Sequence, residues 1–123
     1  MANIIIADDA SFMRSSLKFI IEAGGHKVVG MAVNGKELLK LYRQLKPDLV
    51  TLDILMEEMD GLQALETLRK EDPKANVIMV TALGQEDKQK TAQKLGAAGY
   101  IRKPFKAKDI NDEIARALGG AVQ

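Results

Sequence analysis

Short runs of apolar residues recur along the chain and are separated by stretches in which apolar and polar residues mix. Four runs are continuous rather than alternating, at residues 3–7, 28–32, 49–52 and 77–80, and a weaker fifth run covers residues 99–101. Continuous apolar runs are typical of parallel strands that are covered on both faces. The pattern therefore predicts five buried strands.

The stretches between these runs are amphipathic and predict helices. The first helix should end at the glycines 24–25, because glycine favours helix termination. Asn34 followed by Glu37 is the pattern of a capping box that opens a second helix, and Asp60 followed by Gln63 resembles a cap for a third. These signals place three helices between the predicted strands.

The last two helices are predicted at residues 85–95 and around residues 110–118. The stretch 85–95 offers only Ala92 and Leu95 as clear core contacts, so we expect it to be the most weakly anchored helix. Five strands that alternate with five helices predict an α/β fold, in which a parallel sheet has right-handed crossovers and helices on both faces.

Length and charge limit the classes of function. A chain of 123 residues corresponds to one compact domain, so we expect its output to leave through the surface of that domain. Eighteen basic and seventeen acidic residues leave a net charge of +1, and no overall field would attract nucleic acid or anionic lipid. We therefore expect no direct nucleic-acid partner.

Other residue types are informative through their scarcity. With no cysteine and one histidine, the chain cannot build disulfides, thiolate metal sites or multi-histidine metal sites. The longest stretch without a charged residue, 75–85, has eleven residues, whereas a membrane helix needs about 20 apolar residues. The first nine residues carry two aspartates and no basic residue, unlike a secretory signal. We expect a cytoplasmic protein with no membrane partner.

Polar side chains come at or just after the ends of four predicted strands. Asp8 and Asp9 follow the first run, Asp53 follows the third, Thr81 the fourth and Lys103 the fifth. Sites in open parallel sheets lie outside the carboxyl ends of the strands, where the strand order reverses. If the first and third strands are neighbours, the three carboxylates converge and repel one another unless a cation lies among them. Oxygen-only ligands suit Mg²⁺, with Mn²⁺ as the alternative.

This combination of groups is suited to phosphoryl chemistry. A divalent cation, the Lys103 ammonium and the Thr81 hydroxyl together can neutralise and orient the oxygens of a phosphoryl group. Because no Ser, Cys or His lies at the centre of the predicted rim, the natural nucleophile is a carboxylate. Asp53 stands alone at the tip of the central strand and is the best placed.

The segments that carry these residues resemble the response-regulator receiver domain of two-component signalling. The matching segments are Asp8-Asp9, residues 53–61, Val80-Thr81-Ala82 and Lys103-Pro104-Phe105. Their order and spacing are highly specific, and the resemblance extends from residue 4 to about residue 118. Residues 8–14 and 81–85 are most similar to single-domain chemotaxis regulators.

The resemblance implies the fold, the acceptor and the metal ligands. It implies one receiver domain over residues 1–123, with a flavodoxin-like, doubly wound sheet in the order 2-1-3-4-5. Asp53 would accept a phosphoryl group from a histidine kinase. Asp9, Asp53 and the backbone carbonyl of Leu55 would bind Mg²⁺, and Asp8 would help through a water molecule.

The resemblance also implies how the signal leaves the domain. Thr81 and Lys103 would hold the phosphoryl oxygens, Tyr100 matches the aromatic switch position, and the Lys103-Pro104 bond would be cis. The changed surface of the fourth helix, fifth strand and fifth helix would bind a target protein, for example a flagellar motor switch in chemotaxis. The chain would be a signalling switch and not an enzyme, with self-phosphorylation and slow self-dephosphorylation as its only reactions.

Three positions beside the site set this chain apart. Glu57, followed by Glu58, stands where the family usually has proline, which adds negative charge and backbone freedom. Leu55 and Leu83 lie two residues beyond Asp53 and Thr81. Leucine cannot orient a hydrolytic water, so we expect slow self-dephosphorylation and a dependence on a separate phosphatase.

Several alternatives remain open at this point. A phosphatase of the haloacid dehalogenase type would need an aspartate at position 55, where this chain has leucine. A flavodoxin-like FMN module would need a phosphate loop rich in Ser, Thr and Gly after the first strand, where this chain has Asp8-Asp9-Ala10. The chain can also be a phosphorelay carrier or the excised receiver of a larger regulator, with residues 119–123 as a natural tail or the start of a linker.

Overall fold

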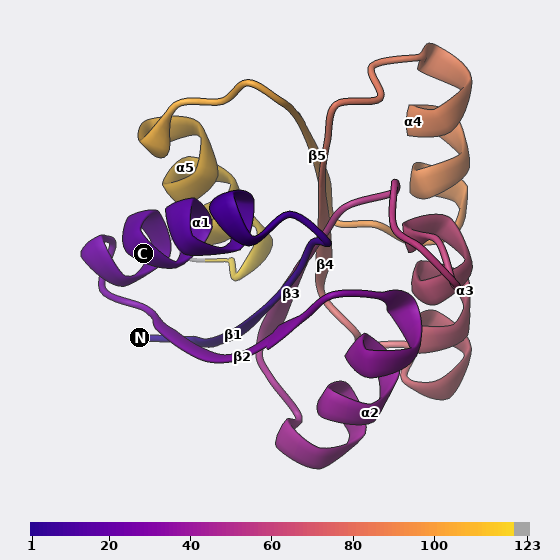
Figure 1. Ribbon diagram of the computed structural model, residues 1–123, viewed down its shortest axis with the longest axis horizontal. Coiled ribbons are helices and arrows are strands. Elements are labelled where there is room, and N and C mark those ends of the chain that lie inside the picture. Colours follow the sequence, from indigo (N-terminus) through magenta and orange to yellow (C-terminus); the bar gives the residue numbers. More distant parts are fainter. Residues whose placement is uncertain (120–123) are drawn as a thin grey trace.

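Ten regular elements alternate between strand and helix in the computed structural model, which describes residues 1–119 (Figure 1). The strands are β1 (Asn3–Ala7), β2 (Lys27–Ala32), β3 (Leu49–Leu52), β4 (Val77–Thr81) and β5 (Gly99–Arg102). The helices are α1 (Ser11–Ala23), α2 (Gly35–Leu45), α3 (Gly61–Glu71), α4 (Glu86–Lys94) and α5 (Ala107–Ala117). Most of the expected tail or linker, residues 120–123, lies outside the described residues.

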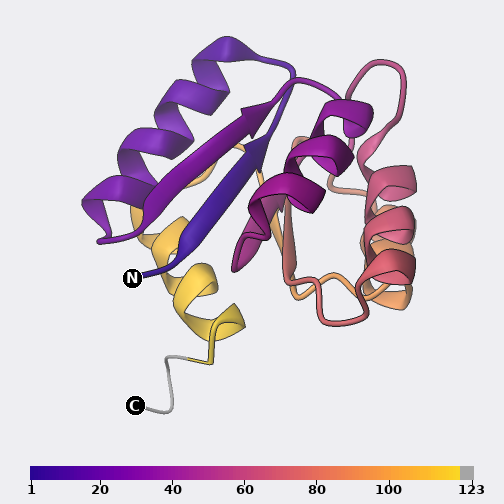
Figure 2. The ribbon, with the colours of Figure 1, turned by 90° about the horizontal axis from the view of Figure 1, so that it is seen from below.

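The five strands form one parallel sheet in the order β2-β1-β3-β4-β5. Helices α1 and α5 cover one face of the sheet, and α2, α3 and α4 cover the other (Figure 1, Figure 2). The predicted doubly wound α/β fold is confirmed, including the strand order. Because the order reverses between β1 and β3, the carboxyl ends of these two strands flank the switch point of the sheet.

Successive residues of the inner strands supply two apolar cores, one on each face. Ile5, Val50 and Met79 pack in the core beneath α2, α3 and α4. Ile4 and Ile78 pack in the core beneath α1 and α5. Apolar contacts on both faces explain why these strands are continuous apolar runs in the sequence.

The two predicted caps differ in their outcome. Asp60 and Gln63 form a complete capping box at the start of α3, with each side chain bonded to the backbone N–H of the other residue. Asn34 accepts the Glu37 N–H, but the Glu37 carboxylate accepts the N–H of Val33 instead of that of Asn34. The predicted box at α2 is therefore wrong in its second half. The φ angle is −154° at Asn34 and −70° at Asp60, so the N–H groups of the two caps differ in orientation relative to the helix that follows.

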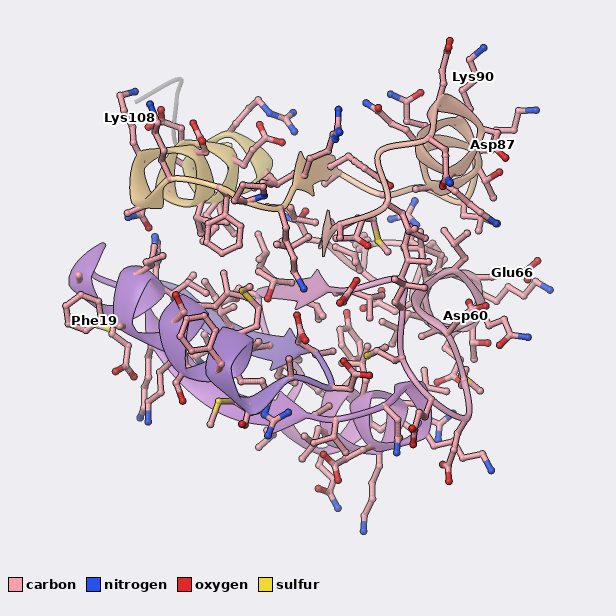
Figure 3. All side chains as sticks on the ribbon, turned by 45° about the horizontal axis from the view of Figure 1, so that its top comes forward. Phe19, Asp60, Glu66, Asp87, Lys90 and Lys108 are labelled. Atoms are coloured by element: carbon pink, nitrogen blue, oxygen red, sulfur yellow. The ribbon has the colours of Figure 1, made fainter. Side chains whose placement is uncertain are left out.

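Helix α4 is as weakly anchored as its sequence indicates. Within α4, which is described in full, only Ala92 is buried, and Leu95 packs against the core from the position just after the helix. Asp87 and Lys90 point outward from this helix (Figure 3). None of the helices in the described part of the chain is long and apolar enough to cross a membrane.

Candidate functional site

The polar residues that follow the strands meet at one edge of the sheet. Strands β1 and β3 are direct neighbours, so Asp8 and Asp9 lie beside Asp53. One carboxylate oxygen from each of these three residues lies within 4.8 Å of the other two. Asp8 and Asp53 are buried, with 1% and 5% of their surface exposed, whereas Asp9 is exposed. The structure thus brings together the three carboxylates that the sequence singled out.

Lys103 connects two of these carboxylates. Its Nζ donates to Asp8 Oδ2 at 2.7 Å and to Asp53 Oδ2 at 3.0 Å, and its backbone N–H donates to the Thr81 carbonyl at 2.9 Å. Burial alone would lower the pKa of the Lys103 ammonium, but its hydrogen bonds to Asp8 and Asp53 outweigh burial and raise the pKa above the usual value. The ammonium therefore stays charged and offsets part of the negative charge of the cluster.

The acceptor candidate Asp53 is held at the tip of β3. Its backbone N–H donates to the Ala7 carbonyl at 3.0 Å, and its Oδ1 accepts the Leu55 N–H at 3.2 Å. Gly61 lies directly behind it, since a Cβ on Gly61 would be 2.1 Å from the Asp53 carbonyl oxygen. The start of α3 can approach the acceptor this closely only because residue 61 is glycine. Gly61 was not among the residues predicted to form the site.

Asp8 is fixed by its neighbours in the chain. Its Oδ1 accepts the Ala10 N–H at 2.9 Å, and Arg14 donates from Nη1 to its backbone carbonyl at 2.8 Å. The N-cap of α1, Ala10, has no side-chain hydrogen bond, so the aspartate pair is not the cap of this helix. Arg14 was missed by sequence reasoning, because a contact to a backbone carbonyl leaves no motif.

The donor set of the acidic cluster fits a divalent cation. Three carboxylates supply hard oxygen ligands within reach of one point, and Lys103 contacts Asp8 and Asp53 but leaves Asp9 exposed. Asp8, Asp9 and Asp53 could therefore bind a metal ion. The implied contribution of the Leu55 carbonyl stays a prediction.

Thr81 and Tyr100 are linked through the backbone of Leu83. Thr81 is fully buried, and its Oγ1 accepts the Leu83 N–H at 3.3 Å. The half-buried Tyr100 donates from its hydroxyl to the Leu83 carbonyl. Burial raises the pKa of the Tyr100 hydroxyl, so it remains a donor at neutral pH. The sequence predicted the two side chains but not the residue between them.

Comparison with known proteins identifies the family. The response regulator receiver domain matches residues 4–115. The chain belongs to this family. Chemotaxis protein CheY of Listeria monocytogenes is 45% identical over 117 residues, which cover 95% of this chain and 98% of that protein. CheY of Thermotoga maritima is 47% identical over 111 residues, which cover 90% and 92%.

Solved receiver structures agree with the fold. CheY in the CheX-CheY-BeF3-Mg²⁺ complex from Borrelia burgdorferi matches with a TM-score of 0.91 and 33% identity, over 93% of this chain and 87% of that chain. A CheY-like receiver domain from Methanospirillum hungatei matches with a TM-score of 0.90 and 29% identity, over 98% and 95%. This receiver domain therefore has the architecture of its relatives.

The residues that set this receiver apart border the same edge. The side chain of Leu55 is 52% exposed and that of Leu83 is half-buried. Glu58, after the position where proline is usual, adopts a left-handed backbone with φ of 66°. Glu57 and Glu58 line a cavity of about 250 Å³ together with Asp9. The two glutamates thus place additional negative charge next to the acidic cluster.

Proposed function

We propose that this receiver domain is a phospho-acceptor signalling switch, in which Asp53 takes a phosphoryl group from a histidine kinase. The observation that carries the proposal is the pairing of the Lys103 ammonium with the Asp8 and Asp53 carboxylates at the carboxyl edge of the sheet. A buried carboxylate beside a fixed cation can act as a nucleophile whose product, a phosphorylated aspartate, keeps a counter-charge.

The transfer uses groups that are already in place. An oxygen of Asp53 forms a bond to phosphorus while the bond between phosphorus and the donor histidine nitrogen breaks, and that nitrogen keeps the electron pair. Lys103 and the Thr81 hydroxyl then hold the transferred oxygens. Mg²⁺, bound by Asp9, Asp53 and the Leu55 carbonyl with Asp8 acting through water, would supply neutralisation of the developing charge.

The output is proposed to leave through α4, β5 and α5. The hydrogen bonds of Thr81 and Tyr100 to Leu83 connect the acceptor edge to this surface. The CheY names of the relatives support a chemotaxis role, and the CheX-CheY-BeF3-Mg²⁺ complex from Borrelia supports a further protein partner. A flagellar motor switch as the target stays a prediction. A cytoplasmic location and an origin in a larger regulator or a phosphorelay stay predictions.

The deciding test is intact mass spectrometry after incubation with acetyl phosphate and Mg²⁺. We expect one labile phosphoryl adduct on the wild type and none on Asp53→Asn, whereas Asp112→Asn, which removes an exposed carboxylate on α5, should label normally. Asp9→Ala and chelation by EDTA should each slow labelling. Equal labelling of the Asp53→Asn variant would show that another residue is the acceptor.

A further inference from the structure

A groove opens beside the acceptor, between the loop that follows β3 and the start of α4. It has a volume of about 440 Å³, and Asp9, Leu55, Met56, Leu83 and Lys88 are among its lining residues. Because Asp9 lines it, the groove is continuous with the acidic cluster.

Aliphatic side chains line part of the groove, next to the carboxylates of Asp9, Glu57 and Asp60. Leu55 comes from the loop after β3 and is 52% exposed, and Leu83 comes from the loop after β4. Ile54, which is 3% exposed, lies beneath them. Exposed leucine next to a cluster of carboxylates is apolar surface in contact with water. Covering it with an apolar group is favourable, because apolar area is removed from water.

The direction of the reaction determines which group would meet these leucines. In phosphoryl transfer the attacking and leaving oxygens lie roughly in line, so the leaving group departs on the side of phosphorus opposite the Asp53 oxygen. Because Asp53 is only 5% exposed, the leaving group departs toward solvent, and the groove bordered by Leu55 and Leu83 offers one side on which it can do so. A leaving group with an aliphatic chain would contact both.

We propose that the groove binds the aliphatic chain of small acyl phosphates, so that propionyl and butyryl phosphate donate to Asp53 better than acetyl phosphate does. The inference rests on the proposed function of Asp53 as the acceptor. The step is balanced without any further reactant: an Asp53 oxygen bonds to phosphorus, the bond between phosphorus and the acyl oxygen breaks, and the fatty acid leaves as its carboxylate with the electron pair.

The expected preference follows from the transfer of methylene groups out of water. Full burial of one methylene group raises affinity about fourfold. Partial burial of the same group in a half-open groove raises affinity about twofold. Propionyl and butyryl phosphate add one and two methylene groups to acetyl phosphate. Their parent acids have nearly the same acidity, so the intrinsic reactivity of the three donors is matched.

The experiment measures Asp53 labelling by intact mass with acetyl, propionyl and butyryl phosphate at equal Mg²⁺, over a range of donor concentrations. We expect the half-saturating donor concentration to fall about twofold to fourfold per methylene group in the wild type. Leu55→Ala and Leu83→Ala should flatten this dependence, which is read within each variant as the ratio of half-saturating concentrations between the three donors. The matched control, Leu45→Ala, removes an exposed leucine at the far end of α2 and should keep the wild-type dependence.

The outcomes separate the inference from the function on which it rests. The same half-saturating concentration for all three donors would overturn the proposal that the groove binds the acyl chain. So would a dependence on chain length that is unchanged in both leucine variants. Either result leaves Asp53 as the acceptor. Failure of every donor to label a folded wild type would overturn the proposed function itself. Spontaneous hydrolysis of each donor, measured without protein, corrects the rates.

Discussion

The ammonium of Lys103 lies 3.0 Å from Asp53 Oδ2 and also contacts Asp8, so it bridges the two carboxylates. Lys103 and Asp8 are 95 positions apart in the chain. This contact joins the ends of the first, third and fifth strands. It also makes the stability of the domain depend on one charged side chain that is 15% exposed. Removal of one partner from such a pair leaves buried charges uncompensated.

The first prediction concerns alkaline pH. The pKa of Lys103 in the folded state is raised above its ordinary value of 10.5, so its stabilisation is fully present below that pH and is lost as the pH rises through the folded-state pKa. We expect the free energy of unfolding of the wild type to fall above about pH 10.5 more steeply than that of Lys103→Met. Urea titrations at several pH values measure this difference.

At neutral pH the same Lys103→Met substitution should cost about 3 kcal/mol, because Asp8 and Asp53 lose their counter-charge. Mg²⁺ should recover part of the loss. Lys108→Met is the control, since its pair with Asp112 is exposed on α5 and its loss should change stability little. A cost in Lys103→Met no larger than in this control would contradict the role of the bridge.

The second prediction concerns transmission from the acceptor. Phosphorylation should draw the Thr81 hydroxyl toward Asp53, which weakens its bond to the Leu83 N–H and frees Tyr100 to move. We expect amide chemical shifts to change across α4, β5 and α5 in the wild type. In Thr81→Val the changes should be confined to the neighbourhood of Asp53, and an equally wide spread in that variant would exclude Thr81 from the path.

The residues at the strand ends could be predicted from the sequence, whereas the contacts between loops could not. Asp8, Asp53 and Lys103 could be placed at one edge because parallel strands end at a common edge, whatever the loops do. The strand order that makes Asp8 and Asp53 neighbours came from the resemblance. The approach of Gly61 to Asp53 and the role of the Leu83 backbone could not be predicted, because both depend on how two loops pack. The same holds for the capping box at Asn34, where the Glu37 carboxylate accepts the N–H of Val33 rather than that of Asn34.

The third prediction concerns the buried hydroxyl of Thr51, which lies outside the acceptor site described above. Thr51 is 2% exposed in β3, and among the described residues its hydroxyl has no hydrogen-bond partner. Thr51→Val replaces this hydroxyl with a methyl group and should stabilise the domain by about 1 kcal/mol in urea unfolding. Thr67→Val is the control, because that exposed hydroxyl donates to the Gln63 carbonyl and its loss should not stabilise. Destabilisation by Thr51→Val would point to a bound water at this hydroxyl.

The last prediction concerns the lifetime of the phosphorylated state. Hydrolysis of an acyl phosphate needs a water in line with the bond that breaks, and polar side chains beside the phosphoryl group can orient it. The side chains of Leu55 and Leu83 border the groove beside the acceptor and carry no hydrogen-bonding group. We therefore expect slow self-dephosphorylation, and faster decay in Leu55→Asn and Leu83→Glu at the same Mg²⁺ concentration.

The decay is followed by intact mass after removal of the donor, with Leu45→Asn as the control for a polar substitution away from the site. Because leucine also blocks water sterically, Leu55→Ala separates the two causes: decay as fast as in Leu55→Asn would assign the effect to exclusion of water, and wild-type decay would assign it to the missing hydrogen bond. Equal or slower decay in both polar variants would contradict the prediction.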